Sequence, residues 1–191
     1  MDTNKDTENY KPSAPTPADN NVISTKITDE DLTEVIKDEF GAEYSKDGKR
    51  LLGAPYDVLE YDIKEGTEII CDFAFSLRES LASITIPPSV NTIGDGSFSN
   101  CSSLTSITIP PSVTSIGDGA FEGCENLTSI TIPSSVTTIG NGAFYGCSSL
   151  TSITIPTSVT AIGSGAFIDC ENLDDATKSE IRRRFGDEVF D

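Results

Sequence analysis

The chain has 191 residues, a formal net charge of −18 and an isoelectric point near 4.1. Nucleic-acid phosphates and anionic membrane surfaces repel so acidic a chain, so neither is expected as a partner. There is no histidine and no tryptophan, which excludes imidazole metal ligands and Ser-His or Cys-His catalysis, and no metal or cofactor is expected. No apolar run approaches the roughly 18 residues of a membrane-spanning helix, so no direct membrane insertion is expected.

Residues 1–22 differ in composition from the rest of the chain. Three prolines, Pro12, Pro15 and Pro17, lie there among Asn, Asp, Thr and Lys. Such a segment cannot bury enough apolar surface to offset the entropy lost on folding. It is therefore predicted to be a disordered tether, and it has no hydrophobic region of the kind that a signal peptide carries.

Residues 23–57 are predicted to form an N-terminal cap made of a helix and a hairpin. Thr28 is the expected N-cap, Asp31 closes a capping box with it, and Gly41 is the expected stop. The apolar residues that would share one helix face are Leu32, Val35, Ile36 and Phe40. The hairpin is predicted over residues 44–52, where Asp47 and Gly48 separate two short strand-like runs.

The middle of the chain repeats with a period of 23 residues. The repeated positions are Leu81, Leu104, Leu127, Leu150 and Leu173; Phe98, Phe121, Phe144 and Phe167; Cys101, Cys124, Cys147 and Cys170; and Gly94, Gly117, Gly140 and Gly163. A fixed period of this length is typical of a repeat array. A divergent first copy over 58–80 places Phe75 at the Phe position, Cys71 at the Gly position and Arg78 at the Cys position, as expected for a terminal unit.

One repeat, residues 104–126, predicts two short extended pieces and a turn. Alternation in the first piece directs Ile107 and Ile109 inward and Ser106 and Thr108 outward. A second piece places Val113 and Ile116 inward, Gly117 and Gly119 permit a sharp turn, and Phe121 returns to the centre. Burial of about six apolar side chains cannot offset the ordering of a whole repeat, so the repeats must stack. Residues 58–173 are therefore predicted to be a mainly β repeat solenoid of about five coils.

Residues 174–191 are predicted to form a C-terminal helical cap. Asp174 or Asp175 is the expected N-cap, and Gly186 is the expected stop. The basic cluster Arg182–Arg184 falls in the last turn, where positive charge favours a helix. A solvated face or ion pairs with local acids explain this cluster better than a docking site does.

The repeat pattern Leu-x-x-Ile-x-Ile-Pro-x-x-Val-x-x-Ile-Gly-x-x-Ala-Phe-x-x-Cys closely resembles the BspA-like leucine-rich repeats of bacterial surface proteins. The resemblance is strong over 81–173 and loose over 58–80. It implies a short right-handed leucine-rich-repeat solenoid, here with helical N- and C-terminal caps, in a secreted or cell-surface protein that adheres to host proteins or other cells. Because the sequence shows neither a signal peptide nor an anchor, the surface location rests on the resemblance alone, and a cytoplasmic location is the alternative.

The cysteine row has two interpretations. A metal or redox array needs clustered ligands, whereas here neighbouring cysteines lie 23 residues apart in sequence. Stacking brings them within disulfide range, but parallel side chains suit the disulfide dihedral poorly. A row of buried free thiols is therefore expected, with Cys71, out of register, the most exposed of the five.

The recurring Gly-Asp-Gly turns also have a functional and a structural interpretation. They are neither a Gly-x-Gly-x-x-Gly phosphate loop nor a calcium-binding repeat, because the Asp95 and Asp118 position becomes Asn141 and Ser164 in later repeats. A turn imposed by the coil geometry is the expected explanation.

The candidate binding surface is a set of Ser and Thr residues on one outward face of four successive repeats: Ser83, Thr85, Ser106, Thr108, Ser129, Thr131, Ser152 and Thr154. Solubility with β-propensity, a flat face for a protein or glycan partner, and an ice-binding lattice all fit this pattern. We expect a non-enzymatic binding or adhesion module, monomeric, that contacts its partner through this face. The alternative is a structural spacer or an intracellular protein-interaction scaffold without a small ligand of its own.

Overall fold

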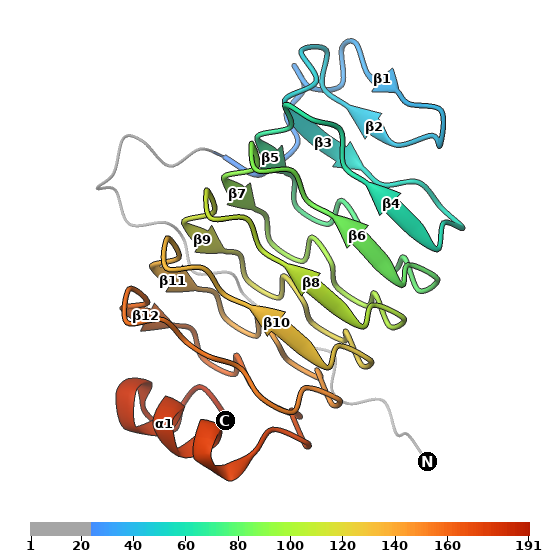
Figure 1. Ribbon diagram of the computed structural model, residues 1–191. Helices are drawn as coiled ribbons and strands as arrows, with labels where there is room; N and C mark the ends of the chain where they lie inside the picture. The colour runs from blue at the N-terminus through green and yellow to red at the C-terminus, as the bar shows by residue number, and fades with distance from the viewer. Residues whose placement is uncertain (1–23) are drawn as a thin grey trace, which may run out of the picture.

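The computed structural model describes residues 24–191, so the predicted tether over 1–22 lies outside the described residues. Figure 1 shows a stack of similar coils with an extra group of strands at the N-terminal end and one helix, α1, at the other. The predicted β-solenoid of about five coils is confirmed, because five parallel strands, one from each coil, follow one another in the sheet order.

Each complete coil carries a three-residue outer strand and a two-residue strand on the opposite side. The outer strands are β4 (Glu60–Asp62), β6 (Ser83–Thr85), β8 (Ser106–Thr108) and β10 (Ser129–Thr131). The opposite strands are β5 (Ile69–Ile70), β7 (Thr92–Ile93), β9 (Ser115–Ile116), β11 (Thr138–Ile139) and β12 (Ala161–Ile162). The five two-residue strands pair in parallel with a 23-residue offset, whereas the outer strands pair only as β4 with β6 and β8 with β10, as in Ile107 with Ile130.

The N-terminal strands extend the sheet that β5 begins. They are β1 (Ile36–Lys37), β2 (Glu43–Tyr44) and β3 (Arg50–Gly53), paired antiparallel in that order, and β3 pairs in parallel with β5. The predicted hairpin at Asp47-Gly48 is confirmed, since the Ser45 N–H donates to the Arg50 carbonyl at 3.0 Å and Gly48 has a φ of 73°. This pairing covers the first edge of the array.

The predicted helix between Thr28 and Gly41 is wrong. Its capping box does form, because the Thr28 N–H donates to Asp31 Oδ2 at 2.8 Å, but only turns follow before β1. Asp31 is also held by the Arg50 guanidinium at 2.9 Å, and Asp38 accepts the Ala42 N–H at 2.8 Å, which forms the turn into β2. A lone helix of about ten residues is marginal in water, and strand pairing satisfies the same backbone groups.

The core of the solenoid is a stack of phenylalanine rings. Successive centroids from Phe75 through Phe98, Phe121 and Phe144 to Phe167 lie 4.9, 5.3, 5.6 and 5.4 Å apart, and every ring is buried. The stack continues beyond the repeats, to Tyr61 at one end and Phe190 at the other. The inward positions predicted for Ile107, Ile109 and Val113 are confirmed.

The row of buried free thiols is also confirmed. In each of four coils the cysteine Sγ donates to a Phe carbonyl 26 residues earlier at 3.2 Å. The expectation that Cys71 is the most exposed cysteine is wrong: it is fully buried against Leu52 and Ile69. Burial raises the pKa of Cys71, Cys101 and Cys170 to about 12, so these thiols are protonated and unreactive near neutral pH.

The C-terminal helix α1 (Asp175–Phe185) forms as predicted, with the Asp174 carboxylate accepting the Thr177 N–H at 2.9 Å and Gly186 at its end. Arg182 and Arg183 make the expected ion pairs with nearby acids. Arg184 instead donates to backbone carbonyls of the last coil, Ile155 at 2.6 Å and Pro156 at 2.9 Å, and so fixes α1 against the solenoid. Within residues 24–191 no helix has the length and apolarity needed to cross a membrane.

Candidate functional site

The eight predicted Ser and Thr residues lie together on one surface, the hydroxyl face. Ser106 pairs with Ser129 and Thr108 with Thr131 in the β8–β10 register, and a bridge joins Thr131 to Thr154. All eight side chains are exposed, because they alternate along each strand with inward isoleucines such as Ile107. The result is two parallel ranks, one of serines and one of threonines, with roughly 4.8 Å between neighbouring strands.

The hydroxyls of this face make no bonds inside the part of the chain that the structure describes. Threonines on the opposite side behave differently: Thr137 Oγ1 donates to the Thr114 carbonyl at 3.2 Å, and Thr160 Oγ1 donates to the Thr137 carbonyl at 3.3 Å. Those hydroxyls support the stacking of coils. The hydroxyls of the hydroxyl face remain available to water or to a partner.

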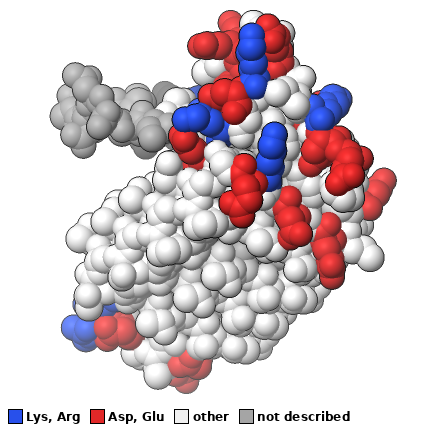
Figure 2. All heavy atoms as spheres, turned by 45° about the horizontal axis from the view of Figure 1, so that its top comes forward, with Lys and Arg blue, Asp and Glu red and all other residues white. Residues whose placement is uncertain are grey.

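The two ranks begin with carboxylates, which the sequence analysis did not single out. Glu60 pairs in register with Ser83, and Asp62 with Thr85, and both acids are exposed. Figure 2 shows charged side chains gathered over the N-terminal end, while the coils beyond are largely uncharged. The signal was present in the alignment of the divergent copy 58–80 with the next repeat, which places Glu60 under Ser83.

The Gly-Asp-Gly turns hold the coils together. Asp72 Oδ1 accepts the Asp95 N–H at 3.0 Å, Asp95 Oδ1 accepts the Asp118 N–H at 2.8 Å, and Asp118 Oδ1 accepts the Asn141 N–H at 2.7 Å. These amides are therefore engaged between coils and do not converge on a phosphate. No three His, Cys, Asp or Glu residues between 24 and 191 are placed to hold a metal ion.

The stacked carboxylates make stability depend on pH. Burial raises the pKa of Asp95, and the charges of Asp72 and Asp118 raise it further. Asp95 is thus destabilising when ionised, and this penalty is complete above its folded pKa and absent below the ordinary value of 3.8. We expect Asp95→Asn, which keeps the acceptor oxygen, to gain less than about 1 kcal/mol of unfolding free energy at pH 7 and nothing at pH 3, by urea melts.

The reverse substitution is the matched control. Asn141→Asp adds a carboxylate directly beside Asp118 and is expected to lower stability at pH 7 but not at pH 3. A loss of stability for Asp95→Asn at pH 7 would show that hydrogen bonding, and not charge, dominates this row.

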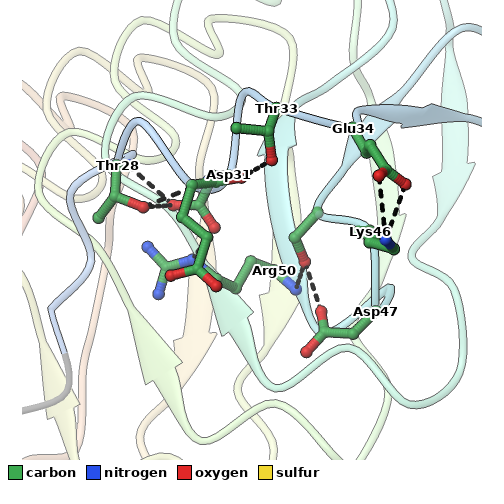
Figure 3. Close-up of a pocket in the computed structure, with 9 residues that line it drawn as sticks. Thr28, Asp31, Thr33, Glu34, Lys46, Asp47 and Arg50 are labelled. Carbon is green, nitrogen blue, oxygen red and sulfur yellow. Dashed lines mark hydrogen bonds and ion pairs between the residues drawn. The ribbon is translucent and has the colours of Figure 1, made fainter.

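A hollow of about 570 Å³ lies in the N-terminal cap, between the turn after Thr28 and the β2–β3 hairpin (Figure 3). Both of its basic groups are paired with acids that line it: Arg50 with Asp31 at 2.9 Å and Lys46 with Glu34 at 2.9 Å. Arg50 also donates to main-chain carbonyls of the segment that enters the cap. The hollow is therefore a structural junction that ties the first described residues to β3.

The comparisons with known proteins agree with this architecture. A family described as BspA type leucine-rich repeat region matches residues 62–191 in 6 copies. A leucine-rich cell surface protein from Faecalibacterium prausnitzii A2-165 is similar at 33% identity with a TM-score of 0.66. That match covers 80% of this chain and 40% of that one, so this chain spans less than half of that protein.

A leucine-rich repeat protein of T. pallidum is similar at 24% identity with a TM-score of 0.54, which shows a shared fold alone. The match covers 78% of this chain and 92% of that one. No curated protein matches the sequence.

Proposed function

The chain belongs to the BspA-type leucine-rich repeat family, and we propose that it is a non-enzymatic adhesion module that contacts a protein or glycan partner through its hydroxyl face. The observation that carries this proposal is the set of eight exposed, unbonded hydroxyls held in two ranks. Repeat proteins bind through such extended, regular surfaces.

The physical properties of the face favour binding. Its backbone is fixed by the parallel strands, and Ser and Thr lose little side-chain entropy when a partner covers them. A preorganised surface avoids much of the ordering cost that weakens association. Hydroxyls both donate and accept, so the ranks can match the hydrogen-bonding groups of a partner along the solenoid axis.

We also propose that the chain acts at the cell surface. Support comes from the F. prausnitzii relative, which is described as a cell surface protein. Adhesion through the uncharged hydroxyls of this face is compatible with such a location, since salt screens their contacts little.

Arrays of purified matrix proteins and glycans would test the function. The variant Thr108→Lys/Thr131→Lys should abolish binding to any ligand that the native chain captures, because two charges are inserted in the centre of the face. Folding should be nearly intact, since both positions are exposed. The control is Thr114→Lys/Thr138→Lys, which inserts the same charge at exposed positions on the opposite side of the coils, next to β9 and in β11, and should leave binding unchanged.

Two outcomes would contradict the proposal. Binding that survives in the hydroxyl-face variant but fails in the control would place the contact on the sheet that contains β9 and β11. Arrays on which the native chain captures nothing would favour a structural spacer. Circular dichroism and thermal melts of each variant ensure that a loss of binding is not a loss of fold.

A further inference from the structure

The hydroxyl face has two carboxylates of its own at the β4 end, whereas at the other end Thr154 lines a hollow with Glu180 and Arg184 of α1. Its outward strand positions hold Glu60 and Asp62 on β4 and one serine and one threonine on each of β6, β8 and β10, and Ser152 and Thr154 follow in the next coil. Both acids lie on β4, in register with the first serine and the first threonine of the ranks. No Lys or Arg occurs between residues 81 and 173, so the four repeats that follow β4 place no positive side chain on the face.

These two carboxylates take part in no ion pair, whereas four other acids at the N-terminal end do. The four ion pairs, of 2.7 to 2.9 Å, join Glu43 to Lys37, Glu34 to Lys46, Glu68 to Lys49, and Asp31 to Arg50. Among residues 24–191, Glu60 and Asp62 take part in no ion pair and no side-chain hydrogen bond. Both acids on the hydroxyl face are therefore free to pair with a partner, as are other exposed acids at this end such as Asp29, Glu39 and Glu65.

A partner that covers β4 must compensate these charges. Exposed carboxylates are well solvated in water, but an uncharged partner laid over them would remove that water and leave an unpaired charge, which costs several kcal/mol. A partner with ammonium or guanidinium groups at this end gains charge-assisted hydrogen bonds instead. The negative field of the whole chain would also speed its approach.

We propose that the partner is a polypeptide whose contact segment places Lys or Arg side chains over β4 and uncharged hydrogen-bonding side chains over β6, β8 and β10. This inference rests on the proposed function of the hydroxyl face. The charge asymmetry of the face sets the direction in which the partner lies along the solenoid.

The test uses two synthetic peptides, one with three lysines followed by alternating Ser and Thr, and one with glutamates in place of the lysines. Each is titrated into the ¹⁵N-labelled full chain, and amide shifts are followed by NMR. The lysine peptide should shift amides of β4 and β6, and the glutamate peptide should not bind. Glu60→Gln/Asp62→Asn should weaken the lysine peptide about 5-fold or more, and added salt should abolish this difference.

A matched neutralisation separates this site from general attraction to an acidic chain. Glu122→Gln/Glu125→Gln removes the same charge from a groove on another side of the coils and should change the affinity little. Equal weakening by both double variants, shifts centred on that groove, or no binding of the lysine peptide would overturn the inference.

The isosteric variant Thr108→Val/Thr131→Val distinguishes failure of the inference from failure of the proposed function. It removes hydroxyls without adding charge and should weaken the lysine peptide as well. If it does so while Glu60→Gln/Asp62→Asn has no effect, the face binds but the charge assignment is wrong. If it has no effect, the hydroxyl face itself is not the contact, and both proposals fail.

Discussion

Phe121→Ala is expected to lower the free energy of unfolding by about 3 to 5 kcal/mol. The Phe121 ring is fully buried, and its centroid lies 5.3 Å from that of Phe98 and 5.6 Å from that of Phe144. The substitution therefore removes two ring contacts and leaves a cavity that rigid coils on both sides cannot close. Urea denaturation followed by circular dichroism measures the loss.

The position of Phe121 in the middle of the stack makes a second result expected. Coils contact only their neighbours, so weakening one interface should uncouple the two halves of the array. Hydrogen exchange should then be faster in the C-terminal coils than in the native chain. Tyr145→Ala, which removes a ring that is 39% exposed, is the control and should cost little. If Phe121→Ala lowered the free energy of unfolding by less than about 1 kcal/mol, the ring stack would contribute little to the stability of the core.

Gly117→Ala is expected to destabilise the chain by about 3 kcal/mol or more, at the upper end of overpacking effects. A Cβ at Gly117 would lie 2.6 Å from the carbonyl carbon of Gly94 and 2.7 Å from the Asp95 nitrogen. Both contacts are with backbone of the preceding coil, which cannot rotate away. The coils would have to separate, with loss of the bond from the Gly117 N–H to the Ile93 carbonyl at 3.1 Å.

Gly119→Ala is the control that separates turn conformation from the close approach of neighbouring coils. Gly119 has a φ of 58°, which an alanine adopts at a cost of about 1 to 2 kcal/mol, but its new Cβ would meet only the flexible Glu122 carboxylate at 3.1 Å. Thermal melts should therefore rank Gly117→Ala as the more damaging change. Equal effects would mean that turn conformation, and not the close approach of coils, explains both glycines.

The repeat pattern predicts that both glycines permit a sharp turn, but only Gly119 has a positive φ. Gly117 is required because a neighbouring coil passes within van der Waals distance. A repeat pattern identifies which positions recur, but not whether a residue serves its own turn or the adjacent coil.

The array could be predicted because each coil has nearly the same surroundings as the next. Inward Ile107, outward Thr108 and the stacked Phe121 follow from alternation and period alone. The N-terminal cap lacks this regularity. The signals from Thr28 to Gly41 are local, whereas the outcome depends on Arg50, which reaches back to Asp31 from the hairpin. The burial of Cys71 likewise depends on cap residues, and its alignment with a repeat glycine contained no information about them.

The candidate site was predicted only in part. The eight hydroxyls were found because they repeat, but Glu60 and Asp62 were missed because they occur once, in the divergent copy. A residue that occurs in one copy alone produces no periodic signal, so its position on the face becomes visible only in the structure.

Because the register repeats every 23 residues, the length of the hydroxyl face can change only by whole coils. Duplication of one coil would add one row to the hydroxyl face and one ring to the phenylalanine stack, with every other row unchanged. An insertion one residue longer or shorter would exchange inward and outward side chains along the strand. Gain or loss of whole coils therefore changes the length of the hydroxyl face, and the two carboxylates of β4 stay at its first end.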